Sequence, residues 1–218
     1  IVDFRQPAVG TEIGGMKSFH VEKGEEKHTY QITTKRELTF SYMLRAKNEE
    51  DAFLQIKRFL SFMPQNIYEL TPRLASKDKK DRREDKLLSI VPKKKNISYE
   101  MRDVIELIFD LKSFFEITKF YGRGIITGFG RINGFSVGIL ANDSNFYAGS
   151  MSAEGAQKTT RFVKTCDRFN LPIISLVDEP GFLIGPEAEQ QATILHGTEA
   201  VLTVAESKVP WSSIMIRK

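Results

Sequence analysis

The sequence predicts an α/β fold for residues 99–218, and three patterns support this prediction. Two apolar, β-branched runs flank Asn133-Gly134, a pair typical of the tight turn in a β-hairpin. Apolar residues at helical spacing follow, and a short apolar run at 173–177 then indicates a buried strand. Strands that alternate with helices require crossover connections, which place the helices against the faces of one sheet.

The first segment, residues 1–70, contains one clear element. Residues 10–46 alternate loosely around glycines, which indicates short strands or irregular structure. Asn48 then offers a capping side chain, and the acidic residues that follow it favour the positive end of a helix. Apolar residues at helical spacing continue towards Pro64, which ends the predicted helix.

Residues 71–98 are predicted to be a charged linker between two domains, 1–70 and 99–218. Arg73 to Lys95 contain ten basic and four acidic residues, an excess that is larger than the net charge of +4 of the whole chain. The acids are interleaved with the bases, and no aromatic residue is present to stack on a nucleobase. We therefore expect a solvated segment or a patch for an acidic partner, and no nucleic-acid site.

The second segment, residues 99–218, holds the regular elements. Pro186 suits the first turn of a helix, and Glu187 suits its positive end. In chain order we expect a helix at 101–108, strands at 114–117, 125–132 and 135–140, a helix at 152–169, a strand at 173–177, a helix at 187–206 and a strand at 211–216.

Composition is that of an ordinary globular protein, with 41% hydrophobic and 28% charged residues. No apolar run approaches the ~20 residues of a membrane-spanning helix, so we expect no membrane association. Cys166 is the only cysteine, and its place on an apolar helical stripe predicts a buried thiol in a reducing compartment. The histidines, His20, His28 and His196, lack ligand spacing, so no metal site is expected.

Two successive turns after strands are the strongest functional feature. One apolar run ends at Asn142 and leads to Gly149-Ser150 before a helix. The next ends at Asp178 and leads to the turn Pro180-Gly181-Phe182. Turns of this kind present backbone N–H groups to a substrate, which indicates a site built from main chain with few reactive side chains.

Several motifs occur in a characteristic order: Gly128–Gly138, Phe162–Pro172, Val177–Leu183 and His196-Gly197, with Glu12–Gly15, His20 and Leu60–Pro64 upstream. This order resembles the carboxyltransferase (β) subunit of biotin-dependent acyl-CoA carboxylases, and the propionyl-CoA carboxylase type is the most similar. The resemblance implies part of a crotonase/ClpP-like superhelix of β-β-α units. Residues 1–70 would end its N-terminal half, and residues 99–218 would form most of its C-terminal, carboxybiotin-facing half.

The resemblance also implies the chemistry of the two turns. Such enzymes move CO2 from carboxybiotin to the α-carbon of a short acyl-CoA through an enolate that backbone oxyanion holes stabilise. Gly149 and Ser150 are then the expected catalytic residues, whose N–H groups face an oxyanion. Pro180, Gly181 and Phe182 are expected to bind biotin, with Phe182 packed on its bicyclic ring. The alternative for both segments is a purely structural turn.

Partners follow from the same resemblance. We expect biotin carboxylase and biotin carboxyl carrier subunits, and further copies of the carboxyltransferase or a companion chain in a hexamer. The expected cofactor is biotin carried as carboxybiotin, with acyl-CoA as the substrate. The compartment is expected to be the cytoplasm, or the mitochondrial matrix in a eukaryote. The family's Ala-Tyr-Gly-Gly-Ala turn would follow Lys218, so a fragment, a split subunit or an incompletely traced chain is expected.

Two departures from the family pattern keep alternatives open. Glu179 stands where the family has a valine, and Ile184 stands where it has a proline. The alternatives are an acyl-CoA decarboxylase or transcarboxylase of the same fold, and a non-catalytic assembly subunit.

A serine hydrolase triad of Ser150, Asp178 and His196 is a further alternative, although the sequence around Ser150 lacks the Gly-x-Ser-x-Gly elbow.

Overall fold

A computed structural model describes residues 46–217 except 77, 80, 95 and 96, together with the backbone of four strands in residues 1–45. These strands are β1 (Val2–Phe4), β2 (His20–Glu22), β3 (Lys27–Thr33) and β4 (Thr39–Arg45). β2, β3 and β4 lie within residues 10–46, where short strands were one of two expectations. The motif at 12–15 lies outside the described residues.

The described strands form one sheet in the order β2-β3-β4-β1-β5-β6-β7-β8-β9. The strands of the second segment are β5 (Phe115–Ile117), β6 (Ile125–Ile132), β7 (Phe135–Asn142), β8 (Ile173–Val177) and β9 (Trp211–Met215). β5, β6 and β7 are antiparallel neighbours, whereas β7, β8 and β9 are parallel. Asn133 and Gly134 both have positive φ between β6 and β7, so the predicted hairpin is confirmed.

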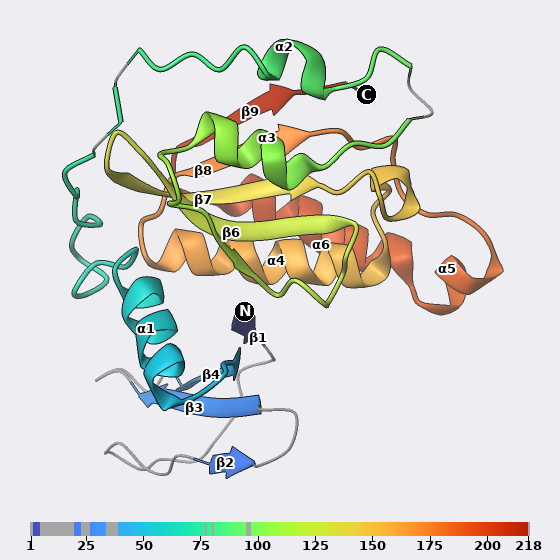
Figure 1. The fold of residues 1–218 in the computed structure, drawn as a ribbon. Helices are drawn as coiled ribbons and strands as arrows, with labels where there is room; N and C mark the ends of the chain where they lie inside the picture. The colour runs from blue at the N-terminus through green and yellow to red at the C-terminus, as the bar shows by residue number, and fades with distance from the viewer. Residues whose placement is uncertain are drawn as a thin grey trace.

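Helices cover both faces of this sheet (Figure 1). α4 (Ala153–Arg168) and α6 (Thr193–Glu206) pack together on one face, and α3 (Met101–Ile108) lies on the other. α1 (Glu49–Leu60) joins the α4 side, and the Asn48 side chain caps it by accepting a hydrogen bond from the Asp51 N–H at 2.8 Å. Three predicted helices are confirmed: the one that begins after Asn48, the one at 101–108 and the one at 152–169.

The core has two layers because alternate residues of each strand face opposite sides of the sheet. Phe129 of β6 packs with Phe162 and Cys166 of α4 and with Phe62 after α1. Ile126 of β6 packs instead with residues of α3 and β7, among them Val104, Ile105 and Ile139. Cys166 is fully buried, as its place on the helical stripe predicts.

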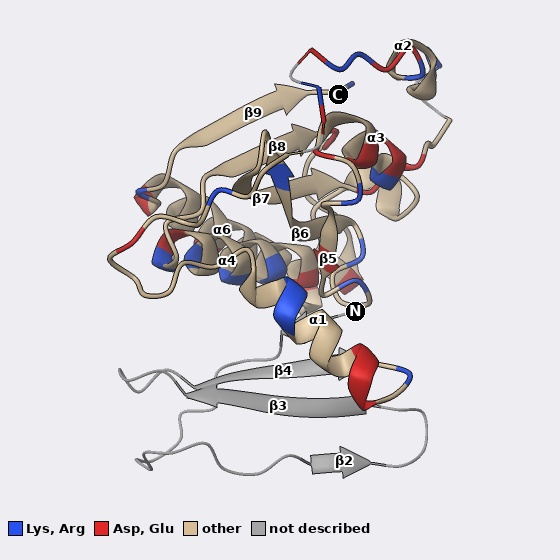
Figure 2. Cartoon of the chain, turned by 60° about the vertical axis from the view of Figure 1, so that its left-hand side comes forward, with Lys and Arg blue, Asp and Glu red and all other residues tan. Residues whose placement is uncertain are grey.

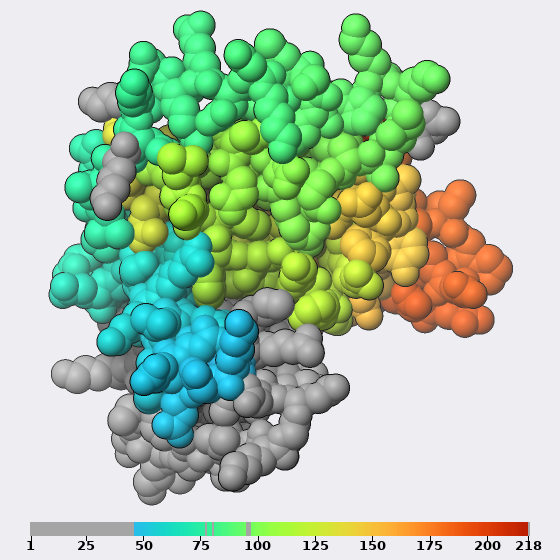
Figure 3. Space-filling view, viewed as in Figure 1, coloured from blue at the N-terminus to red at the C-terminus, as the bar shows by residue number. Residues whose placement is uncertain are grey.

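The single helix predicted at 187–206 is wrong. The structure contains α5 (Pro186–Gln190) and α6, separated at Ala192, whose φ of 54° and ψ of 41° are left-handed. Alanine is a strong helix former, so the sequence carries no local signal of this break. Buried Thr193 donates a hydrogen bond across the break to the Ala188 carbonyl at 2.8 Å, and α5 projects from the side of the molecule (Figures 1 and 3).

The charged segment 71–98 is docked on the molecule. It runs along the upper edge of the molecule in Figure 3, and basic and acidic residues alternate along it in Figure 2. It contains the short helix α2 (Leu87–Ile90), which the sequence pattern did not predict. The Arg82 guanidinium donates hydrogen bonds to the carbonyls of Leu107 and Phe109 at 3.2 and 2.6 Å, which anchors the segment to the end of α3.

Among the described residues, none of the helices combines the length and the apolar character that crossing a membrane requires.

Candidate functional site

The two turns predicted to form the site lie at one edge of the sheet. β7 and β8 are parallel neighbours, and Ala141 stands opposite Leu176 in their register. Both strands therefore end together, which brings the segments after Asn142 and after Val177 side by side. This edge, at the carboxyl ends of parallel strands, is where α/β proteins commonly bind ligands.

Main-chain hydrogen bonds join the two turns directly. The Met151 N–H donates to the Gly181 carbonyl at 2.9 Å, and the Leu183 N–H donates to the Met151 carbonyl at 2.9 Å. Met151 and Phe182 thus form an isolated parallel bridge. The structure therefore brings the Gly149-Ser150 turn and the Pro180–Phe182 turn together, although they lie about thirty residues apart in the sequence.

Gly149 closes a short 3-10 turn, Tyr147–Gly149 (η1), with a φ of 84°. A Cβ at this position would lie 2.5 Å from the Asp178 carbonyl oxygen, so only glycine fits without displacement. Its N–H donates to the Phe146 carbonyl at 2.9 Å, and the Ser150 N–H donates to the Tyr147 carbonyl at 2.9 Å. Both N–H groups expected to face an oxyanion are engaged inside the turn in this structure.

The second turn offers N–H groups that sequence reasoning did not single out as oxyanion donors. Within residues 46–217, no acceptor is found for the N–H of Gly181 or of Phe182. A Cβ on Gly181 or on Gly185 would meet no atom within 4 Å, so this turn borders open space. Phe182 is 38% exposed, and its ring rests on Gly197 of α6, where a Cβ would lie 2.3 Å from the ring. The glycine of the His-Gly pair therefore makes room for Phe182.

Asn142 links the two turns through its side chain. It is buried at the end of β7, where the structure extends the strand two residues beyond the predicted end. Its Nδ2 donates to the Gly149 carbonyl at 3.3 Å and to the Glu179 Oε2 at 3.2 Å, and its Oδ1 accepts from the Asp178 N–H at 3.1 Å. Burial raises the pKa of Glu179 above its ordinary value of 4.5, and the hydrogen bond from Asn142 offsets part of this rise.

The Asp178 carboxylate interacts with Tyr99 and Arg217, which excludes the hydrolase triad. Its fully buried carboxylate accepts a hydrogen bond from the Tyr99 hydroxyl at 2.9 Å and pairs with the Arg217 guanidinium at 3.1 Å. Burial, and then the bond to Asp178, raise the pKa of Tyr99. His196 pairs instead with Gln157 at 2.8 Å, and no hydrogen bond joins Ser150, Asp178 and His196 in the described part of the chain. The triad alternative is therefore wrong.

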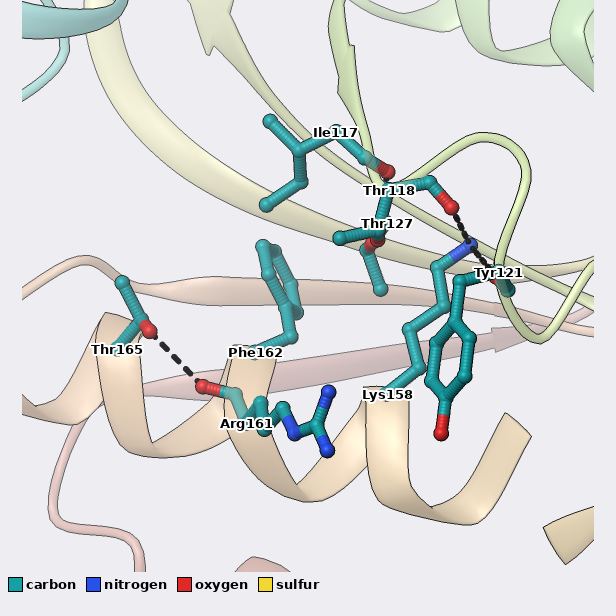
Figure 4. Close-up of a pocket in the computed structure, with 8 residues that line it drawn as sticks. All are labelled: Ile117, Thr118, Tyr121, Thr127, Lys158, Arg161, Phe162 and Thr165. Carbon is teal, nitrogen blue, oxygen red and sulfur yellow. Dashed lines mark hydrogen bonds between the residues drawn. The ribbon is translucent and has the colours of Figure 1, made fainter. Parts of the chain in front are cut away.

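A separate pocket lies between α4 and the β5–β6 side of the sheet (Figure 4). Lys158 projects into it, but its ammonium group is nearly fully buried and donates to the carbonyls of Thr118, Tyr121 and Ile125 at 3.0, 3.0 and 2.6 Å. These bonds hold the loop before β6 against α4, which is a structural role. The pocket shares no lining residue with the two turns. The described residues contain no cluster of three metal-ligating side chains.

Comparison with known proteins points to one family. The family model described as "Carboxyl transferase domain" matches residues 40–218. The carboxyltransferase subunit of propionyl-CoA carboxylase from Haloferax mediterranei is 39% identical over 170 residues, which cover 78% of this chain and 33% of that protein. The α subunit of methylmalonyl-CoA decarboxylase from Veillonella parvula is 38% identical over 173 residues, 79% of this chain and 34% of that protein.

A solved structure of transcarboxylase 12S, described as a hexamer with methylmalonyl-CoA bound, superposes with a TM-score of 0.75 at 35% identity. The match covers 78% of this chain and 33% of that chain. The expected crotonase-like fold is thereby confirmed. The chain spans about a third of the length of the curated relatives that it matches. The family match begins at residue 40, so the motif at 12–15 lies outside it.

Proposed function

The chain belongs to the carboxyl transferase domain family, and on that premise we propose that it is part of the carboxyltransferase component of a biotin-dependent acyl-CoA carboxylase. The observation that carries this proposal is the pairing of the two turns by the Met151 and Leu183 N–H groups. This pairing holds the first turn against the Gly181 and Phe182 N–H groups and the partly exposed Phe182 ring, which suits a reaction that depends on orientation and oxyanion stabilisation.

Biotin fits the second turn on the evidence of the space around it. Gly181 borders a volume that a Cβ would enter freely, and Phe182 offers a partly exposed ring on which one face of a bicyclic group can pack. Pro180, Gly181 and Phe182 are therefore the residues that we assign to biotin binding. When bound, carboxybiotin supplies the activated carboxyl group.

The chain's own residues orient the reactants and stabilise negative charge. The N–H groups of Gly181 and Phe182, which lack an acceptor among the described residues, are placed to donate to an anionic oxygen. Gly149 and Ser150 form the facing catalytic turn. Because their N–H groups donate to Phe146 and Tyr147, a direct role at the enolate requires these bonds to be exchanged for bonds to the substrate. We assign no side chain of the two turns as a general base, and the role of these turns is to orient the reactants and to donate main-chain hydrogen bonds.

An exposed apolar face on α6 supports assembly with further carboxyltransferase chains. Ile194, Leu195, Val201 and Leu202 are between 57% and 68% exposed. Apolar exposure of this extent indicates a surface that another chain covers. Biotin carboxylase and biotin carboxyl carrier subunits are the proposed functional partners, and we propose the cytoplasm or the mitochondrial matrix as the compartment.

The test is transfer of labelled carboxyl groups by the complete protein supplied with biotin carboxylase and its carrier. We expect labelled bicarbonate to enter propionyl-CoA or another short acyl-CoA, and avidin to block the reaction by capturing biotin. Release of labelled CO2 from a methylmalonyl-CoA substrate without net carboxylation would replace the carboxylase assignment with the decarboxylase. Absence of both reactions from a correctly assembled complex would favour the non-catalytic assembly subunit.

A further inference from the structure

The Asn142 side chain uses both of its donors and its carbonyl oxygen in hydrogen bonds to the turns on one edge of the sheet. An asparagine amide has two N–H donors and one carbonyl acceptor group. The two donors reach the Gly149 carbonyl and the Glu179 carboxylate, and the acceptor receives the Asp178 N–H. These partners fix which way the amide points, because the opposite orientation would set its oxygen against two acceptors and its NH₂ against a donor.

No other common side chain of this size can make the same three contacts. Aspartate lacks the donors and would place a second carboxylate beside that of Glu179, whose Oε2 lies 3.2 Å from the Asn142 Nδ2. Leucine has neither donors nor an acceptor. The position is also buried, with 5% of Asn142 exposed, so water does not readily replace a lost partner.

The contacts of Asn142 define how far apart the two turns sit. Its amide holds the carbonyl of Gly149 from one turn and the N–H of Asp178 at the start of the other. Gly149 lies so close beneath the Asp178 carbonyl that a Cβ would be 2.5 Å from it. The main-chain bonds of Met151 then continue the contact outward to Gly181. A movement of the Asn142 amide is therefore passed to both turns.

We propose that Asn142 is a positioning residue for carboxyl transfer: it sets the spacing of the two turns, and Glu179 orients its amide. This inference rests on the proposed function, since positioning has a catalytic consequence only if the turns bind the reactants. The charge of Glu179 strengthens the bond that it accepts from Asn142. Such effects are large where geometry matters, because a displacement of about 1 Å at reacting groups can cost on the order of 10²-fold in rate.

The test compares Asn142→Asp with the double variant Asn142→Asp/Glu179→Gln in the complete protein. The single change removes both donors and adds like-charge repulsion. The double change restores a donor between positions 142 and 179, now on the glutamine, but not the bond to the Gly149 carbonyl. Ser175→Ala is the matched control: Ser175 is buried in β8 and accepts the Trp211 indole N–H at 2.8 Å, away from the turns.

Two measurements are made on each variant. Hydrogen exchange at the Met151 and Leu183 amides reports the spacing of the turns without any need for activity. We expect exchange there to rise by about 10-fold or more in Asn142→Asp, to fall partway back in the double variant and to stay unchanged in Ser175→Ala. In the carboxyl-transfer assay we expect kcat to fall by about 10-fold or more in Asn142→Asp with little change in KM, and to recover partly in the double variant.

The outcomes separate this proposal from the proposed function. Unchanged exchange at Met151 and Leu183 in Asn142→Asp, or a loss of kcat no greater than in Ser175→Ala, would overturn the positioning role. If the wild-type protein transfers no carboxyl group, the proposed function fails. The role of Asn142 in catalysis then fails as well, even if the exchange data show that Asn142 sets the spacing of the turns. If Asn142→Asp does not fold, the double variant decides: wild-type exchange in a folded double variant overturns the proposal, and raised exchange supports it.

Discussion

Replacement of Gly149 by alanine tests the contact on which the paired turns depend. Gly149 has a φ of 84°, and an added Cβ would lie 2.5 Å from the Asp178 carbonyl oxygen. That separation is far shorter than an ordinary contact between carbon and oxygen, and the obstacle is backbone, which cannot rotate away. Gly149→Ala must therefore shift either the η1 turn or the segment after β8.

The expected cost has three parts. A residue with a Cβ in the left-handed region loses about 1–2 kcal/mol. Relief of the contact with Asp178 by local displacement costs roughly 1–3 kcal/mol, as for an overpacked core. Alanine also lowers the conformational entropy of the unfolded chain, which stabilises the folded state by about 0.4–1 kcal/mol and offsets part of this loss. The net loss in the free energy of unfolding is about 3 kcal/mol, which lowers Tm by roughly 6–12 °C in a protein of this size.

Gly185→Ala is the matched control. Gly185 also has positive φ, 115°, but a Cβ there would meet no atom within 4 Å. This variant therefore reports backbone strain without a close contact, about 1–3 kcal/mol, because a φ of 115° with a ψ of 170° is a conformation essentially restricted to glycine. Urea denaturation of wild type and both variants gives the comparison. A loss of less than about 1 kcal/mol in Gly149→Ala would refute the close approach of the two turns, because left-handed backbone strain alone would account for it.

The structure makes three further predictions. Ala192→Gly should stabilise the protein by about 0.5–1 kcal/mol because Ala192 has a left-handed φ of 54°. Ala205→Gly in the helical part of α6 should destabilise it by a similar amount. Urea denaturation measures both, and an equal loss of stability in the two variants would indicate one continuous helix. Burial raises the pKa of Glu179, so its protonation stabilises the folded state below pH 4.5, and this stabilisation is lost as the pH rises through the folded-state value. The stability of wild type relative to Glu179→Gln should therefore increase as the pH falls from 7 towards 4.5, and a difference that is independent of pH would contradict the burial. Cys166 is fully buried with a raised pKa, so a thiol reagent should modify it only as the protein unfolds, whereas rapid labelling of the native protein would show that it is accessible.

Local sequence signals predicted the elements that depend on local chemistry. Asn133-Gly134 predicted a hairpin because its turn needs positive φ at both residues, and the structure has that geometry. The helix around Phe162 and Cys166 and the strand Ile173–Val177 follow from apolar periodicity, because both bury those residues against neighbouring elements. The pairing of the turns could be anticipated only through the family resemblance, since nothing local states that Met151 bonds to Gly181.

Features set by long-range contacts escaped the sequence analysis. Ala192 breaks the predicted helix although alanine favours helices, so intrinsic helix preference does not mark this break. Arg82 looks like one of many charges in a solvated segment, yet it anchors that segment to the carbonyls of Leu107 and Phe109. The sequence places Asn142 only at the end of an apolar run, and its contacts emerge only when Gly149 and Glu179 are brought beside it.

A site made of main chain places its demands on position more than on side-chain chemistry. Every residue other than proline carries an N–H, so the donors at Gly181 and Phe182 survive most substitutions that leave the turn in place. Glu179 and Ile184 can therefore depart from the family pattern without removing a donor. The geometry of the turns depends instead on two residues that control the path of the chain. Gly149 allows the close approach to Asp178, and Asn142 forms hydrogen bonds to both turns. Under the proposed function, substitution at either of these two positions should impair carboxyl transfer more than substitution at Glu179 or Ile184, although neither residue is proposed as a general acid or base.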